Sequence, residues 1–252
     1  MHKELATINL IGTGTIGKQL CKLFLDLNFK VYIFLNSNDS NINLKSFLRE
    51  NYVNRNLIKV NNLNDLKGSI TIESISEDIL LKRKIFDSCP NKSNYFSNTS
   101  SINIKEINET VEALHFFNPV FELKIIETTL TDKNSETEYM INKLYENGYS
   151  IINTKNIQGY VGNFLLFSEI SNYLQVLEKK LISYNDLKIL YKNLYNGRSV
   201  EMIIKTIGVD LCFKIFQNLQ KKYKNLYIPN CFKEFEKIEN KNFTNFLKLL
   251  KK

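Results

Sequence analysis

The fold class is decided near the start of the chain by residues 5–17, which read Leu5-Ala6-Thr7-Ile8-Asn9-Leu10-Ile11-Gly12-Thr13-Gly14-Thr15-Ile16-Gly17. The first seven of these residues predict a short buried strand, and they run directly into a Gly-x-Gly-x-x-Gly turn. An amphipathic helix is expected next, because apolar residues recur on one helical face at Ile16, Leu20, Leu23, Phe24 and Leu27. A second strand is expected at residues 30–35. This order of strand, glycine turn, helix and strand is typical of a dinucleotide-binding unit.

The three glycines of the turn each have a mechanical role in such a unit. Gly12 permits the tight turn, Gly14 lets the backbone approach a pyrophosphate, and Gly17 lets the helix and strand pack closely. The amino end of the helix then faces the phosphates. We therefore expect a dinucleotide to be held by Gly12, Thr13, Gly14, Thr15, Ile16 and Gly17.

The end of the second strand departs from the usual pattern of an NAD site. An Asp or Glu normally bonds the ribose 2'-hydroxyl there, but this sequence reads Phe34-Leu35-Asn36. Asn36 can still offer the ribose one hydrogen bond, although it lacks the charge that repels a 2'-phosphate. No arginine stands at this strand end to bind that phosphate, so NAD is favoured over NADP and the choice stays open.

Strands and helices alternate up to about residue 156, and only helices follow. Further strands are predicted at residues 57–60, 69–73, 94–97, 113–115, 123–127 and 150–153, with helices at 44–50 and 77–86 and another that Ser135 caps. Later helices are predicted at residues 163–177, 184–194, 200–219 and 232–250. This pattern predicts an α/β fold, with a Rossmann-type doubly wound domain over residues 1–157 and a smaller all-helical domain over residues 158–252.

Composition excludes several classes of protein. The net charge of +8 is concentrated in residues 221–252, which hold nine lysines against three glutamates. No nucleic-acid recognition motif accompanies this charge, so we interpret it as a solvated helical face and expect no nucleic-acid partner. No apolar run is long enough for a membrane span, and no secretory signal opens the chain, which predicts a cytoplasmic protein. The scattered cysteines, Cys21, Cys89, Cys212 and Cys231, predict reduced thiols and no metal site.

Two polar positions are candidates for chemistry. His115 is the only histidine besides His2 near the terminus, and imidazole exchanges protons near neutral pH. Glu127 is its natural partner, because apolar flanks predict neighbouring strands joined by a turn. A lone histidine beside two phenylalanines is, however, more often structural. Ser100 belongs to a polar turn after a strand, where open α/β sheets bind ligands, although the same serines could instead cap a helix beginning near Asn103.

Considered together, several motifs carry a resemblance to a known family. They are the glycine turn, Ser97-Asn98-Thr99-Ser100, His115-Phe116-Phe117-Asn118-Pro119, Glu127, and Gly159-Tyr160-Val161-Gly162-Asn163. In this order and spacing they resemble the 3-hydroxyacyl-CoA dehydrogenases, including the 3-hydroxybutyryl-CoA dehydrogenases, over residues 5–215. The resemblance implies NAD-dependent, reversible oxidation of a short-chain L-3-hydroxyacyl-CoA to the 3-ketoacyl-CoA, by a homodimer formed through the helical domain.

The resemblance also implies roles for individual residues. His115 resembles the catalytic base, and Glu127 resembles the carboxylate that orients it. Ser100 and Asn163 resemble the groups that hold the substrate oxygens. The positions that contact the cofactor in the family are matched by Glu77, Lys82 and Asn118.

The chain departs from the family at several points. The helical hairpin that helps to hold CoA is longer in the family than anything that fits between Asn36 and Glu73, and the family's Met-Gly-Pro stretch reads Arg198-Ser199-Val200 here. Phe164 follows Asn163 where an arginine is usual. These departures keep two alternatives open: a non-catalytic homologue that retains the fold and dimer surface, and a dehydrogenase of a 3-hydroxy acid without CoA.

Overall fold

The computed structural model describes residues 6–35, 56–89, 94–131, 134–156 and 159–251. The chain divides into two compact units, Met1–Ile157 and Gln158–Lys252. Asn36 and the short helix expected at residues 44–50 lie outside the described residues.

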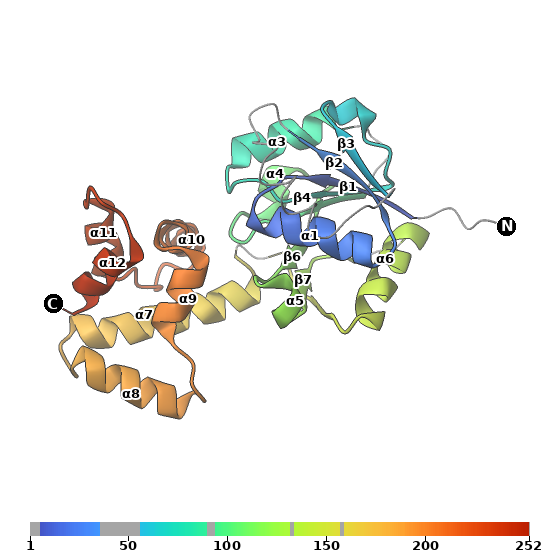
Figure 1. The fold of residues 1–252 in the computed structure, drawn as a ribbon. Helices are drawn as coiled ribbons and strands as arrows, with labels where there is room; N and C mark the ends of the chain where they lie inside the picture. Colours follow the sequence, from blue (N-terminus) through green and yellow to red (C-terminus); the bar gives the residue numbers. More distant parts are fainter. Residues whose placement is uncertain (1–5, 36–55, 90–93, 132–133, 157–158, 252) are drawn as a thin grey trace. The chain divides into compact units, whose positions relative to one another are not determined.

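The first unit is built on one eight-stranded sheet with the order β3-β2-β1-β4-β5-β6-β7-β8 (Figure 1). All neighbouring strands are parallel except β6 and β7, which are antiparallel. The strands are β1 (Thr7–Ile11), β2 (Lys30–Phe34), β3 (Leu57–Val60), β4 (Ile70–Glu73), β5 (Asn94–Ser97), β6 (Glu112–Phe116), β7 (Ile125–Thr128) and β8 (Ser150–Asn153). The expected α/β, doubly wound fold class is thereby confirmed.

Helices cover both faces of this sheet, because its strands are apolar on both sides. Val31 and Ile33 of β2 pack into the core beneath α1 and α6, whereas Tyr32 between them packs into a cluster on the other face, with Cys89 at the end of α3. The helices of this unit are α1 (Thr15–Asp26), α3 (Ile79–Ser88), α4 (Ile104–Ile107), α5 (Val120–Leu123) and α6 (Ser135–Glu146), with a 3-10 turn, η1, at Leu63–Asp65.

Two helix starts in the first unit differ from the sequence prediction by one or two residues, and both are explained by side-chain caps. Asp78 accepts hydrogen bonds from the amides of Leu80 and Leu81, so α3 begins at Ile79 instead of Glu77. Asn134, rather than Ser135, caps α6 by accepting from the amide of Thr137.

The second unit consists of helices in its described part: α7 (Tyr160–Glu178), α8 (Tyr184–Leu194), α9 (Val200–Ile207), α10 (Val209–Lys222), α11 (Asn230–Glu236) and α12 (Phe243–Leu250). The long helices expected at residues 200–219 and 232–250 are each divided. Gly208 has a φ of 96° and separates α9 from α10, a left-handed conformation that glycine adopts readily. Asn242 caps a new helix, α12, by accepting from the amide of Asn245. Among the described helices, none combines the length and apolar character needed to cross a bilayer.

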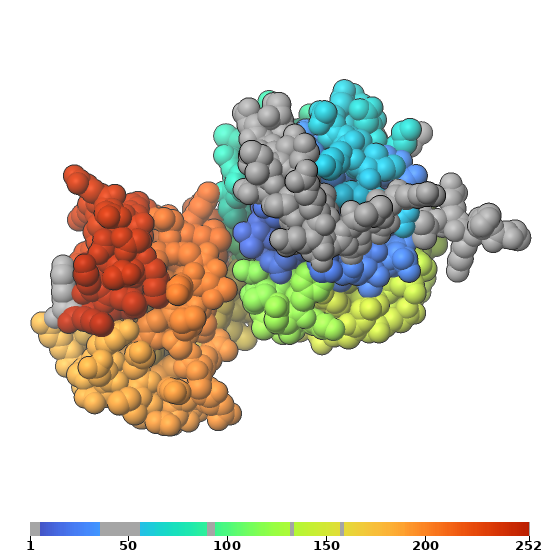
Figure 2. Space-filling model, viewed as in Figure 1, coloured from blue at the N-terminus to red at the C-terminus, as the bar shows by residue number. Residues whose placement is uncertain are grey.

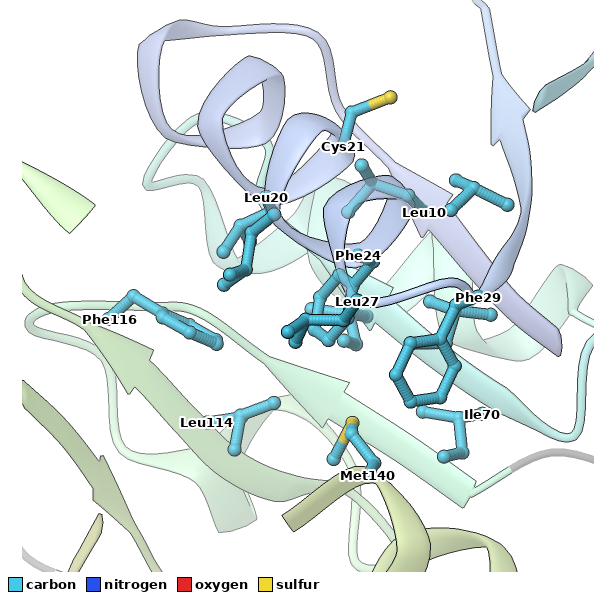
Figure 3. Close-up of a cluster of buried hydrophobic side chains, with 14 of the residues drawn as sticks. Leu10, Leu20, Cys21, Phe24, Leu27, Phe29, Ile70, Leu114, Phe116 and Met140 are labelled. Carbon is cyan, nitrogen blue, oxygen red and sulfur yellow. The ribbon is translucent and has the colours of Figure 1, made fainter. Parts of the chain in front are cut away.

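Phe24 shows how α1 is fixed to the sheet (Figure 3). Its buried ring makes edge contacts with Phe29 and Phe116, at centroid distances of 5.7 and 6.3 Å. Phe116 follows His115 directly on β6, so this packing ties the glycine turn's helix to the strand that carries the histidine.

We therefore expect Phe24→Ala to lower the free energy of unfolding by about 3–5 kcal/mol, because it removes a fully buried ring and leaves a cavity. Urea denaturation followed by circular dichroism measures this loss. Tyr145→Ala, which truncates a half-exposed ring on α6, is the control and should cost much less. Equal losses in the two variants would contradict this account of the core.

Candidate active site

The glycine turn has the shape of a phosphate site. Gly12 has a φ of +116°, and a Cβ added to it would lie 2.4 Å from the carbonyl oxygen of Ser74. A Cβ on Gly17 would lie 2.1 Å from the carbonyl oxygen of Gly12, whereas one on Gly14 would meet nothing within 4 Å. Gly12 and Gly17 are therefore needed by the fold, and Gly14 leaves open space for a ligand.

The amino end of α1 supplies a partial positive charge that favours a phosphate. Gly14 is its N-cap and makes no side-chain cap bond. The first amides of a helix have no intrahelical partner, and with the helix dipole they favour an anion. Residues 12–17 thus fit the pyrophosphate of a dinucleotide, with Thr13, Thr15 and Ile16 completing the turn.

The absence of an acid at the ribose position is explained by the burial of Leu35. Leu35, which stands where an acid is usual, is only 6% exposed and belongs to the core beneath α1. An acid at this position would be buried among apolar side chains, and leucine offers the ribose no hydrogen bond. Asn36, the remaining candidate for this bond, lies outside the described residues.

His115 and Glu127 face each other across the antiparallel pair β6–β7, where their residues are direct partners in the register. Phe116 and Ile126, the neighbouring partners, point into the core, so the alternation of side chains along a strand places His115 and Glu127 on the opposite face. Both are buried, and the distance from His115 Nδ1 to Glu127 Oε2 is 3.5 Å.

This arrangement gives the imidazole a defined orientation. Nδ1 is the ring nitrogen that faces the carboxylate. A distance of 3.5 Å is longer than an ordinary N–H···O hydrogen bond, so the contact is a close pairing of the imidazole with the carboxylate. The ring also packs against Phe117, with 4.7 Å between the ring centroids.

The serine turn that follows β5 is held by Glu77. The carboxylate of Glu77 accepts hydrogen bonds from the amide of Ser100 at 2.6 Å, from Ser100 Oγ at 2.9 Å and from Thr99 Oγ1 at 2.8 and 2.9 Å. Burial alone raises the pKa of Glu77, but the nearby Lys82 ammonium and the hydrogen bonds from Thr99 and Ser100 outweigh it and hold this pKa below its usual value. Glu77 is therefore an anion that fixes Ser100.

Lys82 is completely buried beside two carboxylates. Its Nζ lies 2.7 and 2.8 Å from the two oxygens of Glu73 and 3.7 Å from Glu77 Oε2. Glu77 and Lys82 were expected from the sequence to contact the cofactor. In the structure both lie in a network with Glu73, to which the sequence had given no role. The available signal was an acid directly after the β-branched stretch Ile70-Thr71-Ile72.

Two amide side chains join the parts of the site, and neither was assigned a role from the sequence. Asn98 Oδ1 accepts from the amide of Phe116 at 2.8 Å, which fixes the serine turn against the strand of His115. Gln19 donates to Asn118 Oδ1 at 3.0 Å and accepts from the amide of Val120 at 2.9 Å, which joins α1 to the turn after β6. Asn118 is thus held beside the helix of the glycine turn.

Asn163 lies in the other compact unit, in the first turn of α7, with a buried side chain. Among the described residues, the structure brings no three His, Cys, Asp or Glu side chains into a group able to hold a metal ion. The four cysteines are free and buried.

Comparisons with known proteins show which family the chain resembles. A model of the family described as 3-hydroxyacyl-CoA dehydrogenase, NAD binding domain, matches residues 7–151. A probable 3-hydroxyacyl-CoA dehydrogenase of Caenorhabditis elegans is 26% identical over 174 residues, which is 62% of this chain and 55% of that protein. The alpha subunit of the fatty acid oxidation complex of Shewanella loihica is also 26% identical, over 62% of this chain and 24% of its own length. The chain thus spans about half of the first relative and a quarter of the second.

Solved structures share the fold over nearly the whole chain. FadB2 of M. tuberculosis superimposes with a TM-score of 0.79 at 20% identity, covering 92% of this chain and 94% of that one. The (S)-3-hydroxybutyryl-CoA dehydrogenase PaaH1 of Ralstonia eutropha gives a TM-score of 0.75 at 19% identity, with the same coverage of both chains. The matched family binds NAD, so the expected cofactor is confirmed at the level of the family.

The glycine turn yields a paired prediction for this cofactor. Gly14→Ala should fold normally, because its Cβ meets no protein atom, but its methyl group would occupy the phosphate site and weaken NADH binding by roughly tenfold or more. Gly12→Ala should instead lower the melting temperature, since its Cβ would strike the Ser74 carbonyl. Thermal unfolding and calorimetric titration with NADH measure the two effects. Unchanged NADH affinity in a folded Gly14→Ala variant would contradict this placement of the phosphates.

Proposed function

We propose that this chain, which belongs to the 3-hydroxyacyl-CoA dehydrogenase NAD-binding domain family, catalyses the reversible oxidation of a short-chain L-3-hydroxyacyl-CoA to the 3-ketoacyl-CoA. The observation that carries the proposal is the buried pair of His115 and Glu127 on facing strands. It lies beside a serine turn and in the same compact unit as the glycine turn.

His115 would act as the general base in this reaction. Its Nε2 takes the proton of the C3 hydroxyl during oxidation and returns it during reduction. Glu127, opposite Nδ1, fixes the ring orientation and stabilises the imidazolium that forms. When bound, NAD supplies the acceptor for the hydride that leaves C3.

Other residues would orient the substrate and cofactor. Ser100, which Glu77 fixes, would bind the substrate oxygen, and Asn163 would supply the corresponding amide. Residues 12–17 would hold the pyrophosphate, with Asn118 on the turn after His115. The buried free thiols are compatible with the reducing cytoplasm, where we propose that the protein acts.

The function is tested with acetoacetyl-CoA and NADH, by following the loss of nicotinamide absorbance. We expect turnover by the wild type, a fall in kcat on the order of 10²–10⁴ for His115→Gln because the base is lost, and a smaller fall for Glu127→Gln. Because the chain departs from its family where CoA and the ribose are bound, parallel reactions use free acetoacetate and NADPH.

Each outcome separates the alternatives. Reduction of free acetoacetate in preference to the thioester would replace the CoA substrate with a simple 3-hydroxy acid. Absence of turnover with either nucleotide, in a folded dimer that binds neither NAD nor NADP in calorimetry, would favour a non-catalytic homologue. Full activity in His115→Gln would reject the proposed base.

We further propose that two copies associate through the helical unit. Its surface exposes Ile189 and Leu194 on α8 and Met202 on α9, each more than half exposed, and Figure 2 shows these helices at the surface in orange shades. Leu190 and Leu194 line two adjoining grooves of about 570 and 490 Å³. Apolar surface of this kind is typical of a protein interface.

Light scattering should accordingly give a particle of twice the 29.5 kDa chain mass. The double substitution Ile189→Lys with Leu194→Lys should produce monomers, because it buries charges in the proposed interface. Gln217→Lys, which adds a charge on an exposed position of α10, should remain dimeric. A monomeric wild type at micromolar concentration would contradict the association.

A further inference from the structure

The network beneath the serine turn holds three largely buried charges, from β4, α3 and the segment between them. Glu73 ends β4 and Lys82 belongs to α3, and both side chains are at most 1% exposed. Glu77, in the segment between these elements, is 10% exposed at its side chain. Together they carry a net charge of −1, from two carboxylates and one ammonium.

Glu73 holds the ammonium from below. Both of its oxygens contact Lys82 Nζ, and it also accepts hydrogen bonds from Ser97 Oγ and from the amide of Ile75. Glu73 on β4 therefore holds the Lys82 ammonium in place. The same ammonium lies 3.7 Å from the carboxylate of Glu77.

Glu77 in turn needs to be ionised to hold the turn. Its partners on the turn are all donors: the amide of Ser100 and the hydroxyls of Thr99, Ser100 and Ser101. A protonated carboxyl would bring a hydrogen of its own into this set and lose acceptor capacity. The Lys82 charge opposes the effect of burial, which favours protonation.

We propose that Glu73 is a positioning residue that acts through Lys82: it holds the lysine in place, the lysine keeps Glu77 ionised, and Glu77 fixes Ser100 for the substrate oxygen. The last step rests on the proposed function, whereas the first two concern only the folded chain. On this view the buried lysine is a counter-ion for Glu77.

The inference predicts charge compensation. Lys82→Met keeps most of the apolar stem of the side chain and leaves two carboxylates with a charge of −2, so the variant should melt well below the wild type. Adding Glu73→Gln restores the net charge to −1 and should recover at least half of the lost melting temperature. If the two residues only fill space, the opposite is expected: the double variant should lose at least as much melting temperature as Lys82→Met alone. Lys84→Met, at an exposed position of the same helix, is the matched control.

The pH dependence gives a second readout. In the wild type the folded pKa of Glu77 is lowered, so the stability it contributes is present above the unfolded pKa and is lost only as pH falls through the folded value. In Lys82→Met, the burial of Glu77 is no longer opposed by the cation and raises its folded pKa, so stability should then fall as pH rises above the unfolded pKa. Relative to Lys84→Met, the melting temperature should therefore decline with rising pH in Lys82→Met, and decline less in the double variant, where Glu77 no longer faces a second carboxylate.

The catalytic consequence is measured on the same proteins with acetoacetyl-CoA and NADH. The acid limb of kcat/KM should move upward in Lys82→Met by on the order of one pH unit or more and disappear in Lys82→Met with Glu77→Gln. If the wild type has no turnover, the proposed function fails while the melting data still test the network. A pH-independent difference in melting temperature, or a double variant less stable than Lys82→Met, would overturn the inference.

Discussion

The site depends on glycine at positions 12 and 17, because no residue with a Cβ fits there. The two glycines let the backbone of the turn lie against the Ser74 carbonyl on one side and let α1 lie against Gly12 on the other. This contact fixes the amino end of α1 beside the ends of β1 and β4. Because β1, β4, β5 and β6 are parallel, their carboxyl ends meet at one edge, which therefore gathers the turn, Glu73, the serine turn and His115.

One antiparallel strand completes this edge. If β7 ran parallel to β6, a longer crossover would be needed, and Glu127 would not lie in register with His115 twelve positions earlier. The short α5 turn, tied to α1 by Gln19, reverses the chain instead. The register then pairs an imidazole with a carboxylate on the face opposite the core. A local reversal in an otherwise parallel sheet thus creates the proton-transfer pair that the proposed function requires.

The sequence predicted the parts of the structure that depend on local pattern. Residues 5–35 combine a regular spacing of apolar residues with the glycines of the turn, so the first strand, turn, helix and second strand were recognisable. The apolar flanks of His115 and Glu127 likewise predicted adjacent strands. Long-range hydrogen bonds had no such signal. The bond from Asn98 to the amide of Phe116 and the ion pair of Glu73 with Lys82 join distant segments, and nothing local marks them. The sequence did not predict that residues 200–219 form two helices, because the apolar residues keep helical spacing across Gly208. The backbone of Gly208, with a φ of 96°, is not helical and separates the two.

The burial of Lys82 argues for a functional constraint on the network. Removing a charge from water costs several kcal/mol even after relaxation, and apolar replacements of buried ion pairs are often at least as stable. Stability alone therefore gives little reason to keep Glu73 and Lys82 under the sheet edge. Their arrangement has a consequence that apolar residues could not supply: it allows a second carboxylate, Glu77, to remain charged although nearly buried. An acceptor-only group at that position can hold two hydroxyls and an amide of one turn at once. The cost of burying one lysine is thus offset by a rigid serine turn, which is the kind of pre-organisation that a substrate-binding group needs.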